Sequence, residues 1–351
     1  MKKVGILTFH FCDNYGAVLQ CYALLKVINS MERYNCEVIN YNPNWKPRWF
    51  TDPKMQEKFL AKLEKYVAFR RDFLAIQEGY IYDTSEIKAY DYYVVGSDQV
   101  WNTSFRFSKP TYFLDFVPDN AVKVSYAASV GLAIEDKRLN RTYFEQYIPR
   151  FDYLSIREKT HEQYIKEFTD KSVTTVLDPT LLLRKEDYDE IISRDKEEKE
   201  KFIFLYFLKH DTTAPLMISF VNMLSRKYNL KVIHYFIDVP KQAFKNNSES
   251  FFFEGPQEFL WYIKNAEVVV TNSFHGTIFA IQYHKPFYTY VVKSMSSRVL
   301  DLLQMLGLED RLINGYKNID DVNFDIDFEK VERKLETLRG ESLNYLKVAL
   351  G

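Results

Sequence analysis

The segment 267–287 carries the residue type best suited to proton transfer. Its first part, 268–270, is three valines, which is typical of a short parallel strand buried on both faces. His275 lies in the loop that follows, and an apolar helix pattern then runs from Thr277 until Pro286 stops it. Ligands of open α/β sheets bind beyond the carboxyl ends of the strands, where a following helix offers N–H groups to an anion. His275 is therefore a candidate general acid or base, or alternatively a histidine that only caps the helix.

A second polar loop, 96–102, follows a short apolar strand pattern at 92–95. It places the carboxylate of Asp98 together with an amide and a hydroxyl just past the carboxyl end of that strand. A carboxylate in this position can orient or deprotonate a sugar hydroxyl. It can equally cap the turn that follows, so the sequence leaves both interpretations open for Asp98.

Two further polar residues follow other strand patterns. Arg157 lies at the end of the pattern 153–158. An arginine there can hold a carboxylate or phosphate bidentately, or it can pair with Glu158 or another nearby acid. Asn14 follows the first strand pattern, 4–9, where it suits a helix N-cap and also faces the carboxyl end of the sheet.

These candidates need strands whose carboxyl ends meet, and the order of the apolar patterns supplies them. Strand and helix patterns alternate along the chain, which predicts an α/β fold with doubly wound, Rossmann-like halves. A G-x-G-x-x-G dinucleotide fingerprint is absent. The charge-dense segment 184–201 separates the halves. We expect a first domain at 1–185, a second at 186–325, and a C-terminal helix segment at 326–351 that crosses back to the first.

The composition restricts the class of protein. Of 351 residues, 46% are hydrophobic and 27% charged, and 47 basic residues face 48 acidic ones. This balance indicates a soluble globular protein without a nucleic-acid partner or a strongly anionic membrane. Three cysteines without metal-ligand spacing favour a reduced, cytoplasmic protein and predict no metal site. The apolar run 4–9 is too short for a signal peptide, and no run approaches the length of a membrane span.

Seven blocks of sequence, in order over nearly the whole chain, together carry a family resemblance. The chain resembles the polysaccharide pyruvyl transferase family at 11–20, 96–102, 125–131, 155–158, 177–182, 271–287 and 297–311. Each block alone is weak, and their order makes the kinship specific.

The resemblance implies a fold similar to that of the GT-B glycosyltransferases. Two Rossmann-like, doubly wound domains would face a cleft, with the N-terminal domain on the acceptor side and the C-terminal domain on the donor side. It also implies phosphoenolpyruvate as donor and co-substrate, no other cofactor, and a sugar diol as acceptor. The product would be a cyclic pyruvate ketal in cell-surface polysaccharide biosynthesis. Family members use a histidine that matches His275 and an arginine that matches Arg157.

Phosphoenolpyruvate is small and highly charged, so its site needs positive groups and N–H donors more than shape. The expected donor-binding residues are Arg157, Lys209, Asn272, Ser273, Gly276 and Arg298. Many family members have an arginine two residues before the histidine, where this chain has Ser273. The expected acceptor-binding residues are Asn14, Tyr15, Gln99, Trp101 and Asn102.

The expected chemistry assigns one role to each of two catalytic residues. His275 would protonate the methylene carbon of the donor, after which one sugar hydroxyl adds to C2 and a second displaces phosphate. Asp98 would be the base near the acceptor. The acceptor is a sugar or a lipid-linked oligosaccharide, which would allow peripheral association with the inner membrane face. Two alternatives are a GT-B glycosyltransferase that uses a nucleotide sugar and a catalytically silent glycan-binding relative.

Overall fold

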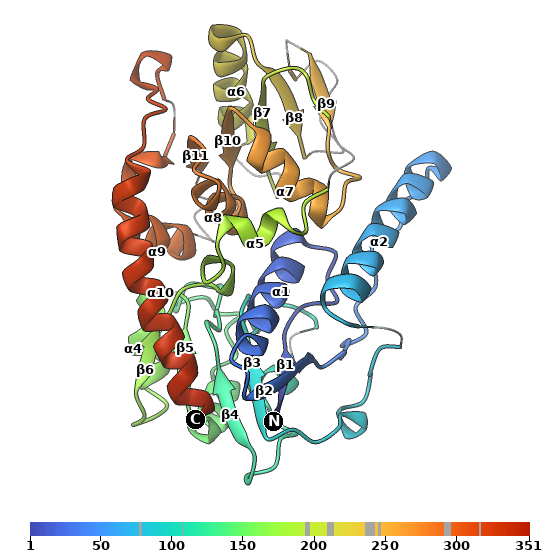
Figure 1. Ribbon diagram of the computed structural model, residues 1–351, viewed down its shortest axis with the longest axis vertical. Helices are drawn as coiled ribbons and strands as arrows, with labels where there is room; N and C mark the ends of the chain where they lie inside the picture. The colour runs from blue at the N-terminus through green and yellow to red at the C-terminus, as the bar shows by residue number, and fades with distance from the viewer. Residues whose placement is uncertain are drawn as a thin grey trace. The chain divides into compact units, whose positions relative to one another are not determined.

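The computed structural model (Figure 1) describes residues 1–76, 79–107, 109–193, 197–208, 214–235, 243–244, 247–290, 296–315 and 317–351. The chain forms two compact units. The first unit comprises Met1–Thr51, Tyr66–Leu183 and Leu335–Gly351, and the second comprises Asp52–Lys65 and Arg184–Lys334.

This division differs from the predicted segments 1–185, 186–325 and 326–351 in one internal stretch and at the last helix. Residues 52–65 group with the second unit, in which Lys65 forms ion pairs with both Glu254 and Glu258. The last helix, α10, is divided between the units at residues 334 and 335.

The first unit is built on a parallel sheet in the order β2-β1-β3-β4. A second pair of parallel strands, β5 and β6, continues from β4 through single bridges at Tyr153 and Ile156. The strands are short, and β3, β4 and β5 are almost wholly buried, as expected of strands that helices cover on both faces, whereas β1, β2 and β6 include exposed residues. Their bounds are β1 Lys2–Leu7, β2 Tyr34–Val38, β3 Tyr92–Val95, β4 Val122–Ser125, β5 Leu154–Ile156 and β6 Val173–Thr175.

Helix α1, Tyr15–Asn29, follows β1 directly and is buried along nearly its whole length. Asn14 caps it, because the Asn14 side chain accepts a hydrogen bond from the backbone N–H of Ala17. The other helices with residues in this unit are α2 Pro53–Phe73, α3 Arg141–Tyr147, α4 Glu162–Lys166 and α10 Phe328–Leu350.

The second unit contains one parallel sheet in the order β12-β11-β10-β7-β8-β9. Figure 1 shows helices α6 and α7 beside this sheet, and α6 packs against β7 and β8. The strand bounds are β7 Phe202–Tyr206, β8 Lys231–His234, β9 Ser248–Ser250, β10 Val268–Thr271, β11 Phe287–Tyr290 and β12 Leu312–Ile313. The helices are α5 Lys185–Asp189, α6 Ala214–Tyr228, α7 Pro256–Asn265, α8 Phe274–Gln282 and α9 Ser296–Leu306.

The α/β alternation predicted from the sequence is therefore present in both units, with parallel sheets throughout. The sequence patterns did not predict β9 and β12. Both are very short edge strands, and β9 consists of exposed polar residues without the apolar pattern that marks a strand. Within the described part of the chain, none of the helices combines the length and apolar character needed to span a bilayer.

Candidate functional site

In the second unit, a set of hydroxyl groups joins the end of β10 to the start of α8. The Thr271 hydroxyl donates to the backbone oxygen of Tyr206 at 2.6 Å and accepts the backbone N–H of Ser273 at 2.9 Å. Ser273 is the N-cap of α8, and its Oγ accepts the backbone N–H of Gly276 at 3.3 Å. The turn between strand and helix is thus fixed by short-range contacts.

His275 is the second residue of α8 and lies in its first turn. Its side chain is buried, and its ring meets the ring of Phe274 edge-on, with the centroids 5.3 Å apart. The buried guanidinium of Arg298 lies 6.0 Å from the centroid of the same Phe274 ring. The structure therefore places an imidazole and a guanidinium beside one aromatic side chain at a helix N-terminus, where anions are favoured.

Gly276 allows α8 to begin close to the strand. A β-carbon added at this position would lie 2.6 Å from Thr271 Oγ1 and 3.0 Å from Tyr206 Cδ1. Neither group can move freely, because Thr271 is in β10 and Tyr206 ends β7. Gly276 therefore serves through its missing side chain, which brings the helix N-terminus near the strand ends.

The remaining predicted donor residues are less uniform. Asn272 ties two strand ends together, since its Oδ1 accepts the backbone N–H of Leu208 at 2.9 Å. Lys209 lies outside the described residues. The sequence interpretation missed Tyr206 and Thr271, although both end buried strand patterns and so mark the carboxyl edge of the sheet.

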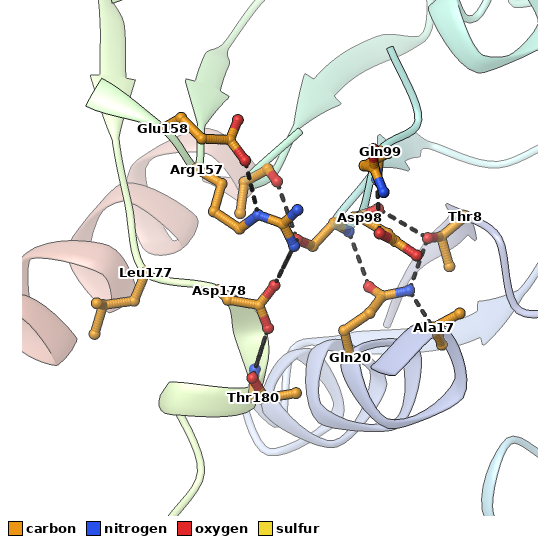
Figure 2. A network of polar contacts seen from close by, with 12 residues as sticks. Thr8, Ala17, Gln20, Asp98, Gln99, Arg157, Glu158, Leu177, Asp178 and Thr180 are labelled. Carbon is orange, nitrogen blue, oxygen red and sulfur yellow. Dashed lines mark hydrogen bonds and ion pairs between the residues drawn. The ribbon is translucent and has the colours of Figure 1, made fainter. Parts of the chain in front are cut away.

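In the first unit, the loop after β3 is held by a network of buried side chains (Figure 2). The backbone N–H of Ser97 donates to Gln20 Oε1 at 3.0 Å, and the backbone oxygen of Ser97 accepts from Thr8 Oγ1 at 3.0 Å. Gln20 Nε2 in turn donates to Thr8 Oγ1 at 2.8 Å and to the backbone oxygen of Ala17. Thr8, Gln20 and Ser97 are all fully buried.

The hydroxyl of Ser97 faces a buried ion pair. Ser97 Oγ lies 3.0 Å from Asp178 Oδ2, and Arg157 Nη1 donates to the same oxygen at 2.7 Å. Arg157 Nε donates to Glu158 Oε1 at 3.1 Å. Figure 2 shows the Arg157 guanidinium between these two carboxylates. These contacts match the second interpretation of Arg157, pairing with nearby acids, and give no support to its predicted donor-binding role.

The electrostatics of this pair follow from burial and opposite charge. Burial alone would lower the pKa of Arg157, but the carboxylates of Glu158 and Asp178 raise it above its usual value. Burial opposes ionisation of Glu158 as well, yet the Arg157 guanidinium holds the pKa of that carboxyl at about 2. The guanidinium and Glu158 are therefore both charged at neutral pH.

Asp98 and Gln99 come directly after Ser97 and are partly exposed. Asp98 has φ of 68°, in the left-handed region that Asp tolerates better than most residues, and its Oδ1 accepts the backbone N–H of Gln99 at 2.8 Å. Asn102 Nδ2 donates to Gln99 Oε1 at 2.9 Å. The structure thus brings the catalytic candidate Asp98 together with two predicted acceptor residues, Gln99 and Asn102.

Two other predicted acceptor residues are packing residues. Trp101 is completely buried, stacks on Phe113, and donates its indole N–H to the backbone oxygen of Tyr112 at 3.1 Å. These contacts give no support to the acceptor-binding prediction for Trp101, because its indole N–H is already bonded and its side chain is completely buried. Tyr15 is also buried and stacks on Tyr66, with the ring centroids 5.7 Å apart.

The sequence interpretation missed Thr8, Gln20, Ser97 and Asp178 as parts of this site. Ser97 and Asp178 lie within segments that carry the family resemblance, which was the available signal. Gln20 lies within such a segment too, whereas Thr8 has the pattern of an ordinary strand residue, and only the contacts of both show that they hold Ser97. Among the described residues, no group of three or more potential metal ligands is present.

A family model described as polysaccharide pyruvyl transferase matches residues 14–294 of the chain. The matched range contains Ser97, Asp178 and His275, whereas Thr8 and Arg298 lie outside it. The same kind of comparison with curated proteins gives no match.

Similar solved structures include three bacterial proteins. The UDP-GlcNAc 2-epimerase of Neisseria meningitidis bound to UDP-GlcNAc aligns with a TM-score of 0.51 at 11% identity, over 99% of this chain and 94% of that one. A putative UDP-N-acetylglucosamine 2-epimerase of Listeria monocytogenes gives 0.53 at 11% identity, over 98% and 90%. MnaA of S. aureus with UDP gives 0.50 at 13% identity, over 98% and 91%. At such identities the likeness shows the fold alone, and it confirms the predicted GT-B class with two Rossmann-like units.

Proposed function

Because the chain belongs to the polysaccharide pyruvyl transferase family, we propose that it transfers the enolpyruvyl group of phosphoenolpyruvate to two hydroxyls of one sugar. The product is a cyclic pyruvate ketal in the biosynthesis of a cell-surface polysaccharide. The observation that carries the proposal is the family match over residues 14–294. This range includes His275, which lies at the N-terminus of α8, the helix that follows the buried strand β10.

The donor site proposed here is the start of α8 in the second unit. Phosphoenolpyruvate carries a phosphate and a carboxylate, which require cations and N–H donors. The start of α8, where the helix dipole favours an anion, and the Arg298 guanidinium supply these features on the described part of the chain. Asn272 holds the neighbouring strand end, and Lys209 is proposed as a second cation.

His275 is proposed as the general acid. It gives its proton to the methylene carbon of phosphoenolpyruvate, which becomes a methyl group while C2 becomes electrophilic. One sugar hydroxyl adds to C2 and loses its proton to a base. A second hydroxyl of the same sugar then attacks C2 and closes the ketal ring. Phosphate leaves with the electron pair of its bond to C2 and takes up the proton of this second hydroxyl.

The acceptor site proposed here lies on the first unit, at the loop after β3. Asp98 accepts the proton of the attacking hydroxyl, and Gln99 and Asn102 hydrogen-bond the sugar. Asn14 contributes from the start of α1, where it is partly exposed while it caps the helix. The acceptor is a sugar or a lipid-linked oligosaccharide, so the enzyme works in the cytoplasm and reaches the inner membrane face through its acceptor.

The decisive experiment compares donors by isothermal calorimetry. We expect the purified protein to bind phosphoenolpyruvate, with an affinity that falls as the salt concentration rises. Turnover in deuterated water should place deuterium in the methyl group of the ketal. Binding of a nucleotide sugar without binding of phosphoenolpyruvate would replace this proposal with a GT-B glycosyltransferase, and sugar binding without turnover of either donor would indicate a silent glycan-binding protein.

A further inference from the structure

The buried network around Ser97 fixes all three polar groups of that residue. Its N–H is bonded to Gln20, its backbone oxygen to Thr8, and its hydroxyl to Asp178 and the backbone oxygen of Ala127. These partners come from widely separated parts of the first unit. Ser97 is therefore held in one position, and this restricts the position of Asp98, the partly exposed residue that follows it.

Asp178 is itself held on both sides of its carboxylate. Its Oδ1 accepts the backbone N–H of Thr180 at 3.0 Å and the Thr180 hydroxyl at 2.6 Å. Its Oδ2 accepts from Arg157 Nη1 at 2.7 Å and lies 3.0 Å from Ser97 Oγ. Oδ1 is thus bonded within its own turn, and Oδ2 connects that turn to Ser97 in the loop after β3 (Figure 2).

Asp98 is held in place by hydrogen bonds of its backbone. Its carbonyl oxygen accepts the backbone N–H groups of Val100 at 2.8 Å and Ser129 at 3.0 Å. Its Oδ1 accepts the backbone N–H of Gln99, so Oδ2 is the oxygen presented to a hydroxyl. Each of these contacts depends on the position of the Ser97–Asp98 peptide.

The orientation of the Gln99 amide is also determined. The backbone N–H of Ser104 can only donate, and it meets Asn102 Oδ1 at 3.1 Å. Asn102 Nδ2 must therefore be the donor to Gln99 Oε1. The NH₂ group of Gln99 is consequently turned away from Asn102 as a hydrogen-bond donor. Gly131 leaves space for this amide, because a β-carbon there would lie 2.3 Å from Gln99 Oε1.

We infer that Asp178 is a positioning residue that acts through Ser97 and Arg157 on the loop after β3. It fixes the two neighbouring residues that face the acceptor sugar: Asp98 accepts a proton from one hydroxyl, and Gln99 donates a hydrogen bond to the other. A carboxylate oxygen and an amide NH₂ on adjacent residues suit a diol, in which one hydroxyl gives up its proton while the other accepts a hydrogen bond. The inference rests on the proposed function, and it assigns Arg157 to the acceptor loop.

The test begins with a readout that needs no substrate. Amide hydrogen exchange is measured on peptides that span residues 96–102 in wild type, Asp178→Asn and Ser97→Ala. We expect exchange in this segment to rise at least fivefold in both variants, because each removes the contact between the Ser97 hydroxyl and the Asp178 carboxylate. Ser97→Ala keeps the Arg157–Asp178 ion pair, so it carries the test if Asp178→Asn fails to fold.

Glu158→Gln is the matched control. Glu158 bonds the Nε side of the same guanidinium, whereas Asp178 bonds Nη1, the nitrogen that also faces Ser97. Loss of either charge weakens one buried ion pair, but only the loss of Asp178 releases Ser97. Equal exchange in residues 96–102 for Asp178→Asn, Ser97→Ala and Glu158→Gln would overturn the inference.

The second readout is kinetic. In Asp178→Asn and Ser97→Ala we expect kcat/KM for the acceptor to fall roughly tenfold to a hundredfold, the usual cost of a small misplacement of catalytic groups. The KM for phosphoenolpyruvate should stay within twofold. A parallel rise in both KM values would mean that Asp178 only stabilises the unit. If wild type consumes no phosphoenolpyruvate, the proposed function fails, while the exchange readout still decides whether Asp178 fixes the loop.

Discussion

The two clusters at the strand ends, one around Ser273 in the second unit and one around Ser97 in the first, are held together by different kinds of contact. The cap of α8 at Ser273 uses neutral, local contacts, with a cap bond to Gly276 three residues ahead and a hydroxyl bond from Thr277 four residues ahead. The longer contacts beside it, from Thr271 to Tyr206 and from Asn272 to Leu208, are also hydrogen bonds between uncharged groups. The cluster at Ser97 uses buried charge and distant partners, and its contacts to Gln20 and Asp178 cross 77 and 81 residues of sequence. Local contacts are enough to form an anion site at the start of a helix. The partly exposed carboxylate of Asp98 lies on a loop, and that loop is held by residues from distant parts of the unit.

Turnover should separate the two clusters most strongly at His275. His275→Gln keeps a hydrogen-bonding side chain at the start of α8 but removes the general acid, so we expect kcat to fall by about a hundredfold to ten-thousandfold. Calorimetry should show that phosphoenolpyruvate binding is largely kept. His284→Gln is the control, because His284 is a partly exposed histidine of the same unit that pairs with Glu332. Normal deuterium incorporation in His275→Gln would assign the proton to another residue.

Stability should separate the clusters at Arg157. Arg157→Ala leaves the carboxylates of Glu158 and Asp178 buried without their cation, so we expect about 3 to 5 kcal/mol of destabilisation in urea. Arg71→Ala removes an exposed arginine of the same unit that pairs with Asp72 and should leave the free energy of unfolding nearly unchanged.

Donor binding in the same variants sharpens the contrast. The affinity for phosphoenolpyruvate should be unchanged within twofold in folded Arg157→Ala, and Arg157→Lys should recover part of the stability. A thirtyfold loss of donor affinity would instead make Arg157 a donor-binding residue.

Part of the pH dependence of stability should arise in the first unit. His10 is fully buried beside Thr8, and burial lowers its pKa from 6.5 to about 4, with hydrogen bonds to Asn40 and Thr8 partly offsetting the effect. The unfolded chain takes up this proton at higher pH than the folded chain does. Stability from this group is therefore complete above pH 6.5 and is lost as pH falls toward 4, by up to about 3 kcal/mol.

The measurement is the unfolding free energy of wild type and His10→Gln between pH 7 and pH 4. The difference between the two proteins should change across this window, since glutamine does not titrate. Parallel curves would show that His10 does not supply the pH dependence.

The smallest effect is expected at the N-cap of α8. Ser273→Ala removes the acceptor of the Gly276 N–H and should cost about 1 kcal/mol, while Ser273→Asn should restore most of it because Asn is an equally good cap. Chemical denaturation measures both. A loss well above 2 kcal/mol would mean that the second cluster depends on more than local contacts.

The contrast also explains what the sequence could predict. The strand, cap and helix around His275 follow from residues close together in sequence, so the pattern 268–286 contained the information. Asp98 could be selected as a candidate because it ends a strand pattern. Its support by Gln20 and Asp178 could not, because single-sequence patterns do not reveal which distant polar residues share a buried space. For the same reason Trp101, in a polar loop, looked like a ligand contact although it packs in the core.

The interrupted first unit has a consequence for synthesis on the ribosome. Its last segment, Leu335–Gly351, supplies Ser342, whose hydroxyl accepts the backbone N–H of Leu177, and Arg339, whose Nε donates to the backbone oxygen of Leu181. Both contacts flank Asp178. Translation of residues 184–334 comes first and takes on the order of ten to thirty seconds at roughly 5 to 20 residues per second. The contacts of Ser342 and Arg339 with the turn that contains Asp178 can therefore form only after the whole second unit has left the ribosome. The unit whose synthesis begins first is completed last.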